Sequence, residues 1–353
     1  MNLPNSNDIP VSKLASAFGN TSATYKFYWF LSIIEMVEQA QLILSKRVLF
    51  ARMICNGWYT VNYFHVSFGK QDLIQQAVKS ILKHEGLSID IKKDLLLDVL
   101  MTSSLKSTQQ TLHHFNKNVP HWFLSPWFTK EKGDNDTNYR KYIYISSQKF
   151  ENECMYALYD NHIVINPKWV DYLKTNAKIL KDFIYWNLTL FLQVRNPNIP
   201  DLANKLIKPP LRGSLYNQRK NYWDIVFKEL GTVNCIFTGK TLTIGQYALD
   251  HFVPHAFVSH DLIWNLVPID IHFNSIKSDK LPIMENHFEN FFEIQKTAFE
   301  IMTDHAPKNK LLEEYLGIFP DLVNINGFDY IRYKESIQPL ITIAHNNGFG
   351  YLK

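Results

Sequence analysis

The sequence is poor in cysteine and lacks the glycine-rich loops that cradle nucleotide phosphates. Its three cysteines, Cys55, Cys154 and Cys235, form neither a redox pair nor a disulfide framework by spacing, and they exclude a four-cysteine zinc site within one copy. Neither Gly-x-x-x-x-Gly-Lys-Ser/Thr nor Gly-x-Gly-x-x-Gly occurs. Nothing therefore indicates nucleotide hydrolysis by this chain, and an energy-dependent step would need a partner.

Long apolar runs and a strong charge bias are also missing. The stretches 27–37 and 183–194 fall short of the ~20 residues that a membrane-spanning helix needs, and each contains a polar residue. The N-terminus lacks the basic and apolar regions of a secretory signal. Together with the few cysteines, this predicts a cytoplasmic protein without a membrane partner. Because the net charge is only +4, nucleic acid would have to bind through local basic patches.

One stretch of the chain combines polar residues at a distinctive spacing. It consists of three short segments, Leu249-Asp-His-Phe-Val-Pro254, Trp264-Asn-Leu-Val-Pro268 and Asn274-Ser-Ile-Lys-Ser-Asp279. His251 precedes Asn265 by 14 positions (265 − 251), and Asn265 precedes Asn274 by 9 (274 − 265). An Asp-His pair followed by two asparagines at these intervals is far more specific than a lone Asp-His dipeptide.

These side chains suit the hydrolysis of a phosphodiester with one divalent cation. A histidine, whose unperturbed pKa lies near ~6.5, can take the proton of the attacking water. Carboxylate and amide oxygens suit a hard cation such as Mg²⁺, which stabilises the leaving oxygen and keeps several waters. We therefore expect His251 to act as the general base and Asp250 and Asn274 to bind Mg²⁺, with Mn²⁺ as the alternative.

The local pattern predicts a strand or hairpin arm, a loop, a second strand and a short helix over residues 243–250, 255–263, 264–271 and 274–280. Neighbours in a strand point to opposite faces, so Asp250 and His251 should come together only at a strand end or an irregular turn. Pro254 favours an early end to this strand, because proline has no N–H for the ladder.

This segment resembles the HNH, or ββα-metal, nuclease family, and its spacing is similar to that of the HNH domain of the RNA-guided CRISPR nuclease. The resemblance covers about residues 230–285. It implies that Asp250 and Asn274 bind the metal and that His251 is the general base. It also implies that Asn265 orients the loop carrying this base without binding metal.

Lys277 and Cys235 need separate comment. Lys277, in the Lys-Ser-Asp that ends the motif, resembles a basic residue close to the phosphate backbone. Many members of the family hold a structural zinc with two Cys-x-x-Cys pairs, whereas Thr238 stands three residues after Cys235 here. We therefore expect packing, and no four-cysteine zinc, to hold the fold, with core candidates Phe237, Phe252, Phe257, Trp264 and Phe273.

Other polar residues near the motif allow two interpretations each. His272 is a candidate phosphate contact or alternate metal ligand, whereas His255 and His260 are more typical of loop histidines with structural hydrogen bonds. A basic group before the motif is either a nucleic-acid-binding patch or a solvated linker face, and both interpretations stay open. Its members are Lys205, Lys208, Arg212, Arg219 and Lys220.

The whole chain predicts an α+β protein dominated by helices, similar to bacterial HNH proteins with a helical N-terminal region. We expect a helical N-terminal domain for recognition, sensing or oligomerisation, a mixed α/β middle region with a basic linker, the nuclease core and a C-terminal helical extension, over residues 1–117, 118–229, 230–285 and 286–353. Within this scheme, residues 142–146 and 161–165 are predicted strands, and residues 58–64 an extended link.

The sequence thus predicts a metal-dependent HNH endonuclease that hydrolyses DNA. One site cuts one strand, so double-strand cleavage would need a homodimer or sequential nicks. Phage defence or restriction, with a partner protein of a defence system, is the expected setting. Two alternatives stay open. One is a catalytically silent module that binds nucleic acid or a partner. The other is an RNA-cleaving toxin or defence effector, for which metal would be less essential because RNA supplies its own 2′-OH.

Overall fold

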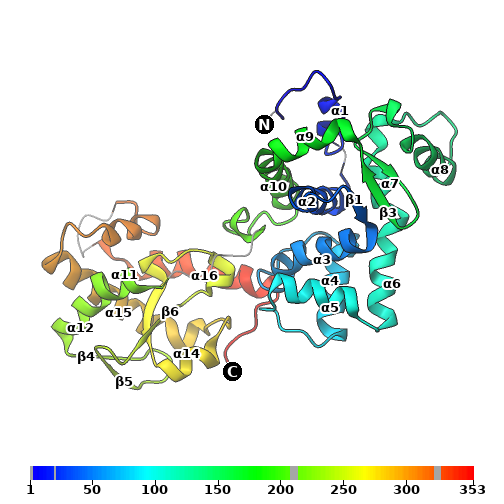
Figure 1. The fold of residues 1–353 in the computed structure, drawn as a ribbon. Helices are drawn as coiled ribbons and strands as arrows, with labels where there is room; N and C mark the ends of the chain where they lie inside the picture. The colour runs from blue at the N-terminus through cyan, green and yellow to red at the C-terminus, as the bar shows by residue number, and fades with distance from the viewer. Residues whose placement is uncertain (1–2, 20, 207–213, 322–326) are drawn as a thin grey trace. The chain divides into compact units, whose positions relative to one another are not determined.

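The computed structural model describes residues 3–19, 21–206, 214–321 and 327–353 (Figure 1). The chain forms two compact units, Met1–Pro197 with Leu202–Lys208 and Asn198–Asp201 with Pro209–Lys353. Both units combine helices with small antiparallel sheets, so the prediction of an α+β chain with mostly helical content is confirmed. Within the described residues, no helix has both the length and the apolarity that crossing a bilayer requires.

The first unit is a helical assembly around α2, which lies between α3 and α10 (Figure 1). Its helices are α1 (Val11–Ser16), α2 (Tyr25–Glu38), α3 (Lys46–Asn62), α4 (Leu73–His84), α5 (Lys93–Thr102), α6 (Lys106–His114), α7 (Val119–Phe123), α8 (Asp136–Ser147), α9 (Pro167–Thr175) and α10 (Ala177–Gln193). Short 3₁₀ turns join or extend them: η1 (Phe115–Lys117), η2 (Ser125–Trp127), η3 (Phe150–Asn152) and η4 (Asn204–Leu206). Both Trp29 and Ile33 of α2 are fully buried, as expected for a helix that is apolar on all sides.

A three-stranded antiparallel sheet completes this unit. Its strands β1 (Ile43–Ser45), β2 (Tyr156–Leu158) and β3 (His162–Ile165) are ordered β1-β3-β2. Strand β3 confirms the strand predicted over residues 161–165. Ser45, the last residue of β1, pairs with His162 and is followed directly by Lys46 of α3. The sheet therefore fixes where α3 begins.

Two predictions for the first unit are wrong. Residues 58–64 were expected to be extended, but α3 continues to Asn62 and packs against α2 and α4, with Trp58 fully buried. Residues 142–146 were expected to form a strand but lie in α8, which Asn135 caps by accepting a hydrogen bond from Asn138 N at 2.9 Å. Helix packing and the cap override the strand preference of the aromatic and β-branched residues in these stretches.

The second unit holds the predicted motif between two groups of helices. Its helical elements are α11 (Tyr216–Gln218), the π-helical turn η5 (Arg219–Trp223), α12 (Asp224–Leu230), α13 (His255–Val258), η6 (Ile263–Asn265), α14 (Ile271–Lys277), α15 (Met284–His305), η7 (Lys310–Gly317) and α16 (Tyr330–Asn346). Its strands form two antiparallel pairs, β4 (Thr232–Asn234) with β5 (Thr241–Thr243) and β6 (Ala248–His251) with β7 (Leu266–Ile269).

The elements around the motif differ in detail from those predicted. The predicted strand 243–250 is divided by a turn at Gly245, whose φ of +81° favours glycine, and only its second part belongs to β6. Part of the predicted loop 255–263 is the short helix α13. Helix α14 begins before Asn274, because Asp270 caps it by accepting hydrogen bonds from His272 N and Phe273 N at 2.9 and 3.1 Å.

Candidate active site

Strands β6 and β7 and helix α14 bring the predicted site residues together. Strand β6 ends at His251, so Asp250 and His251 lie at a strand end as predicted. In the β6–β7 ladder Asp250 is opposite Val267 and His251 is opposite Leu266. Oδ1 of Asp250 lies 4.0 Å from Nδ1 of His251, and the two residues are only 6% and 2% exposed. An acid and a base therefore meet in a largely desolvated place.

The partners of His251 fix which ring nitrogen carries the proton. Its Nε2 lies 2.9 Å from Oδ1 of Asp261 and 3.2 Å from the carbonyl oxygen of His260. An ionised carboxylate and a carbonyl can only accept hydrogen bonds, so Nε2 is assigned as the donor. Nδ1 then keeps its lone pair, on the side of Asp250. This is the tautomer that a general base in contact with a metal ligand needs.

Asp261 is the site residue that the sequence did not reveal. It lies between α13 and η6 in a stretch predicted to be a loop, and no motif spacing marks it. Its carboxylate reaches His251 only because the chain after β6 folds back through α13. Oδ1 of Asp261 also lies 3.9 Å from Nε2 of His255, the neighbour whose ring centroid is 5.2 Å from that of His251.

Asn265 clamps the chain just after the proposed base. It is fully buried, its Oδ1 accepts a hydrogen bond from Val253 N at 2.8 Å, and its Nδ2 donates to Val253 O at 2.8 Å. Its backbone oxygen also accepts from Phe252 N at 2.7 Å. These bonds hold the two residues that follow His251 and use both ends of the Asn265 amide. The geometry suits the orienting role that the family resemblance implies, and not metal binding.

Helix α14 packs against β6 and contributes Asn274 and Lys277. These residues are three positions apart, so they lie on one face of the helix. Asn274 is half-buried, whereas Lys277 is fully buried. Nζ of Lys277 donates to the carbonyl oxygen of His251 at 2.7 Å and lies 2.8 Å from Oδ2 of Asp250. The resemblance would place Lys277 near a phosphate; the structure encloses its ammonium within the site.

The carboxylate of Asp250 fits a role as a metal ligand. Its Oδ2 is buried and receives no hydrogen bond from the described residues, although Nζ of Lys277 lies at ion-pair distance from it. In the part of the chain that the structure describes, no three His, Cys, Asp or Glu side chains cluster as a metal site. A cation here would rest on the Asp250 carboxylate and the Asn274 amide, with water and phosphate completing its shell. Mg²⁺ suits such a sparse oxygen set because it retains several waters.

The other polar residues near the motif lie in varied environments. His272 is exposed in the first turn of α14, while His260 is half-buried with its ring 5.1 Å from that of Trp264. Asp270 caps α14, and its hydrogen bond from Lys240 holds the pKa of this carboxyl below its usual range. Asp270 is thus committed to the fold of the site rather than available as a ligand.

The predicted basic patch needs a correction. Lys205 is fully buried, with its ammonium 5.6 Å from the centre of the Phe64 ring, so it cannot contact a phosphate at the surface. Lys208 and Arg212 lie outside the described residues. Arg219 is half-buried against the Tyr247 ring at 4.7 Å, and Lys220 is exposed. Of the described members, only Arg219 and Lys220 remain candidates for nucleic-acid contact.

Aromatic packing surrounds the site. Phe252, Phe257 and Trp264 are buried as predicted, and the Phe252 ring stacks on Phe291 of α15 with centroids 4.0 Å apart. Phe237 and Phe273 are half-buried and stack on each other at 5.8 Å. Cys235 is buried as a free thiol in the turn between β4 and β5, where its N–H donates to Lys240 O at 2.8 Å.

Comparison with known protein families identifies this part of the chain. Residues 235–283 match the family described as HNH endonuclease, which confirms the family predicted from the motif. The matched stretch contains β5 to α14 and every residue of the proposed site. A search of curated proteins and one of solved structures gave no match.

Proposed function

We propose that this chain, whose residues 235–283 form an HNH endonuclease domain, is a divalent-metal-dependent endonuclease that hydrolyses DNA. The observation that carries the proposal is the state of His251. Its Nε2 is held by Asp261 and the His260 carbonyl, and its Nδ1 lies 4.0 Å from the Asp250 carboxylate. A base with its proton-accepting nitrogen beside a buried carboxylate is what water activation at a metal site requires.

In this reaction a water oxygen forms a bond to phosphorus and gives its proton to Nδ1 of His251. The bond from phosphorus to the leaving sugar oxygen breaks, and that oxygen keeps the electron pair and takes a proton from solvent. His251 becomes an imidazolium, which the carboxylate of Asp261 at Nε2 stabilises. Asn265 keeps the base in place by holding the backbone of Val253. The imidazolium then loses its proton to solvent, which restores the base.

Asp250 and Asn274 would hold the cation, which when bound supplies positive charge to the phosphate and to the leaving oxygen. Lys277 has a separate part in this proposal. Its ammonium offsets the charge of the buried Asp250 carboxylate before any cation binds. The candidate site is thus stable without metal. A metal cation would bind the Asp250 carboxylate while the Lys277 ammonium already lies beside it.

A single HNH site cuts one strand in each event, so nicking is the elementary step. Double-strand cleavage would require two copies of the chain or two successive events. We place the enzyme in phage defence or restriction, an assignment that the family resemblance supports and that activity against invading DNA would test.

The experiment compares cleavage of supercoiled plasmid by the wild type and by His251→Ala in EDTA, Mg²⁺ or Mn²⁺. The wild type should yield nicked or linear DNA only with metal. His251→Ala should lower the rate by about 10²–10⁴-fold while its thermal midpoint and plasmid binding stay unchanged. The matched control is His305→Ala, at an exposed histidine of the same unit, 48% accessible at its side chain, which should cut normally.

The outcomes separate the three candidate functions. Cleavage by His251→Ala at the wild-type rate would refute the proposed base. Salt-sensitive plasmid binding without turnover in any metal would indicate a silent binding module. Cleavage of RNA in EDTA, with all-deoxy substrates left intact, would indicate an RNA-cleaving effector.

A further inference from the structure

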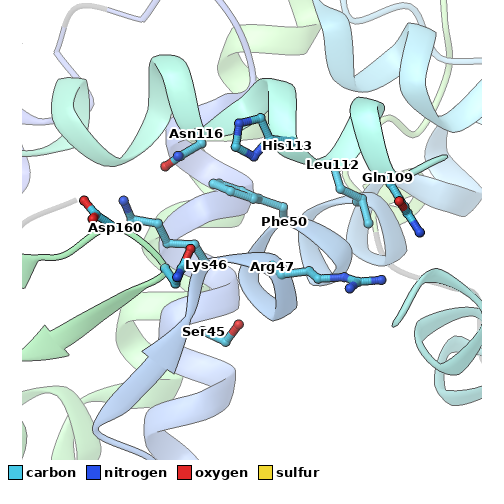
Figure 2. A pocket seen from close by; sticks show the side chains of 10 residues that line it. Ser45, Lys46, Arg47, Phe50, Gln109, Leu112, His113, Asn116 and Asp160 are labelled. Atoms are coloured by element: carbon cyan, nitrogen blue, oxygen red, sulfur yellow. The ribbon is translucent and has the colours of Figure 1, made fainter. Parts of the chain in front are cut away.

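The first unit contains a cavity of about 500 Å³ that the nuclease chemistry does not use (Figure 2). Ser45 and Lys46, where β1 passes into α3, line one wall, and α6 with its extension η1 lines the opposite wall. Phe50 and Leu112 add apolar surface between the two. The volume lies within the range of about 300–1,000 Å³ that is typical of small-ligand sites.

Lys46 is the most unusual residue of this cavity. It is only 5% exposed, yet among the described residues its ammonium has no hydrogen-bond acceptor and no carboxylate at ion-pair distance. In Figure 2 its side chain extends toward Asp160 and Asn116. Burial lowers the pKa of Lys46 to about 8, although the more distant Asp160 acts in the opposite direction. Proteins pair almost all buried charges, because an unpaired one is costly.

Two further features of this cavity suit a polar ligand. Oδ1 of Asn116 is buried and receives no hydrogen bond from the described residues. The side chain of Ser45 does not cap this 17-residue helix α3, whose first N–H, that of Lys46, donates to the carbonyl oxygen of Asn161 at 2.9 Å. Helix N-termini attract anions, and phosphate in particular. The ammonium of a buried lysine, the N-terminus of α3 and a buried amide oxygen thus lie at one cavity.

We propose that this cavity binds a nucleoside monophosphate, with its phosphate on Lys46 at the start of α3 and its base against Phe50 and Leu112. The phosphate supplies the anion that Lys46 lacks. Arg47 already donates to Met101 O at 2.8 Å and points the other way along the cavity (Figure 2). An N–H of the base can satisfy Asn116 Oδ1. Asp160 accepts a hydrogen bond from the Tyr144 hydroxyl at Oδ1, and its Oδ2 can accept one from a ribose hydroxyl. The volume admits one nucleotide and no duplex.

This site is independent of the proposed nuclease reaction, so its test does not depend on cleavage. Isothermal titration calorimetry of the full chain in EDTA would use AMP, GMP, CMP and UMP. At least one should bind, and more tightly than inorganic phosphate or its own nucleoside alone. Lys46→Met should weaken binding at least about tenfold, since a hydrogen bond to a charged group contributes roughly 1.5–3 kcal/mol. Lys174→Met, at an exposed lysine of α9, is the matched control and should bind as the wild type does.

A second variant guards against a folding artefact at Lys46. Asn116→Asp adds a carboxylate to the cavity, so it should also weaken nucleotide binding by repulsion, while circular dichroism stays unchanged. The proposal is overturned if none of the four nucleotides binds at millimolar concentration. It is equally overturned if Lys46→Met binds as tightly as the wild type, or if Lys46→Met weakens only the binding of a DNA duplex.

Discussion

The two units each bury a lysine, and the two lysines have opposite surroundings. In the second unit Lys277 is fully buried, but its ammonium contacts the Asp250 carboxylate and donates to the His251 carbonyl. In the first unit Lys46 is 5% exposed and faces a cavity, with no such partner among the described residues. The charge of Lys277 is compensated by the protein's own fold, whereas that of Lys46 is not.

This difference separates a structural cation from a binding cation. A buried ammonium with partners tightens the structure around it, and removing it leaves those partners uncompensated. A buried ammonium without partners weakens the fold, and such a cost is typical of functional sites. The two lysines should therefore respond to the same substitution with opposite signs.

The largest expected effect is that of Lys277→Met, which leaves Asp250 buried without a counter-charge. The free energy of unfolding should fall by about 3–5 kcal/mol, as for other broken buried ion pairs. Because a bound cation would replace the lost charge, Mg²⁺ should raise the thermal midpoint of this variant more than that of the wild type. Urea unfolding and thermal scans with and without Mg²⁺ measure both effects.

A matched double variant tests the cause of that loss. Asp250→Asn combined with Lys277→Met removes both charges and should recover most of the lost stability. If Lys277→Met unfolds at the wild-type urea midpoint, Lys277 does not compensate the charge of the Asp250 carboxylate. The proposed difference between Lys277 and Lys46 is then wrong.

Lys46→Met should change stability in the opposite direction, by about 1–3 kcal/mol of stabilisation at pH 7, because it removes an unpaired buried charge. The folded-state pKa of Lys46, about 8, lies below the ordinary value of 10.5. The penalty is therefore complete below about pH 8 and fades toward pH 10.5, as the unfolded chain also loses its proton. Urea unfolding at pH 7 and pH 10, beside Lys174→Met, checks this, and a destabilised Lys46→Met would contradict it.

Asp261→Asn tests a second charged group of the candidate site whose partner the fold supplies, the His251 ring. An amide can donate as well as accept, so it no longer forces the proton onto Nε2 of His251. The His260 carbonyl still accepts from Nε2, so kcat should fall by only about 10–100-fold, at or below the lower end of the roughly 10²–10⁴-fold contribution of acid–base groups. KM should stay unchanged, and Asp261→Glu should restore part of the rate. If kcat of Asp261→Asn equals that of the wild type, Asp261 has no part in the reaction.

The smallest expected effect is the pH dependence of nucleotide affinity in the first unit. Affinity should fall about fivefold to tenfold between pH 7 and pH 9, as Lys46 loses its proton through about pH 8. His121 stays neutral in this range because burial lowers its pKa to about 4. Calorimetry on His113→Ala excludes a contribution from that exposed histidine. A pH-independent affinity would contradict the role of Lys46.

The family and part of the geometry of the candidate site could be predicted from the sequence. The spacing of Asp250, His251, Asn265 and Asn274 indicated the family, and the placement of the Asp-His pair at a strand end followed from strand geometry and Pro254. These predictions succeeded because β6, β7 and α14 follow one another closely in the sequence. The residue types and their spacing are therefore enough to indicate the family and the strand end. The extended link predicted over residues 58–64 and the strand predicted over residues 142–146 were wrong because helix packing overrode local preference.

The sequence by itself therefore determined the residue types and spacing of the motif and the family that this segment matches. Only the tertiary structure decided that Asp261 holds His251, that Lys277 turns inward to Asp250, and that Lys46 faces a cavity without a partner. The physical reason is that burial and pairing depend on how the elements pack in three dimensions, which the spacing of residues in the sequence does not reveal. Lys277 lies 27 positions after Asp250 (277 − 250), and Asp160 lies 114 after Lys46 (160 − 46). No local pattern of a lysine reveals whether the fold will give its charge a partner.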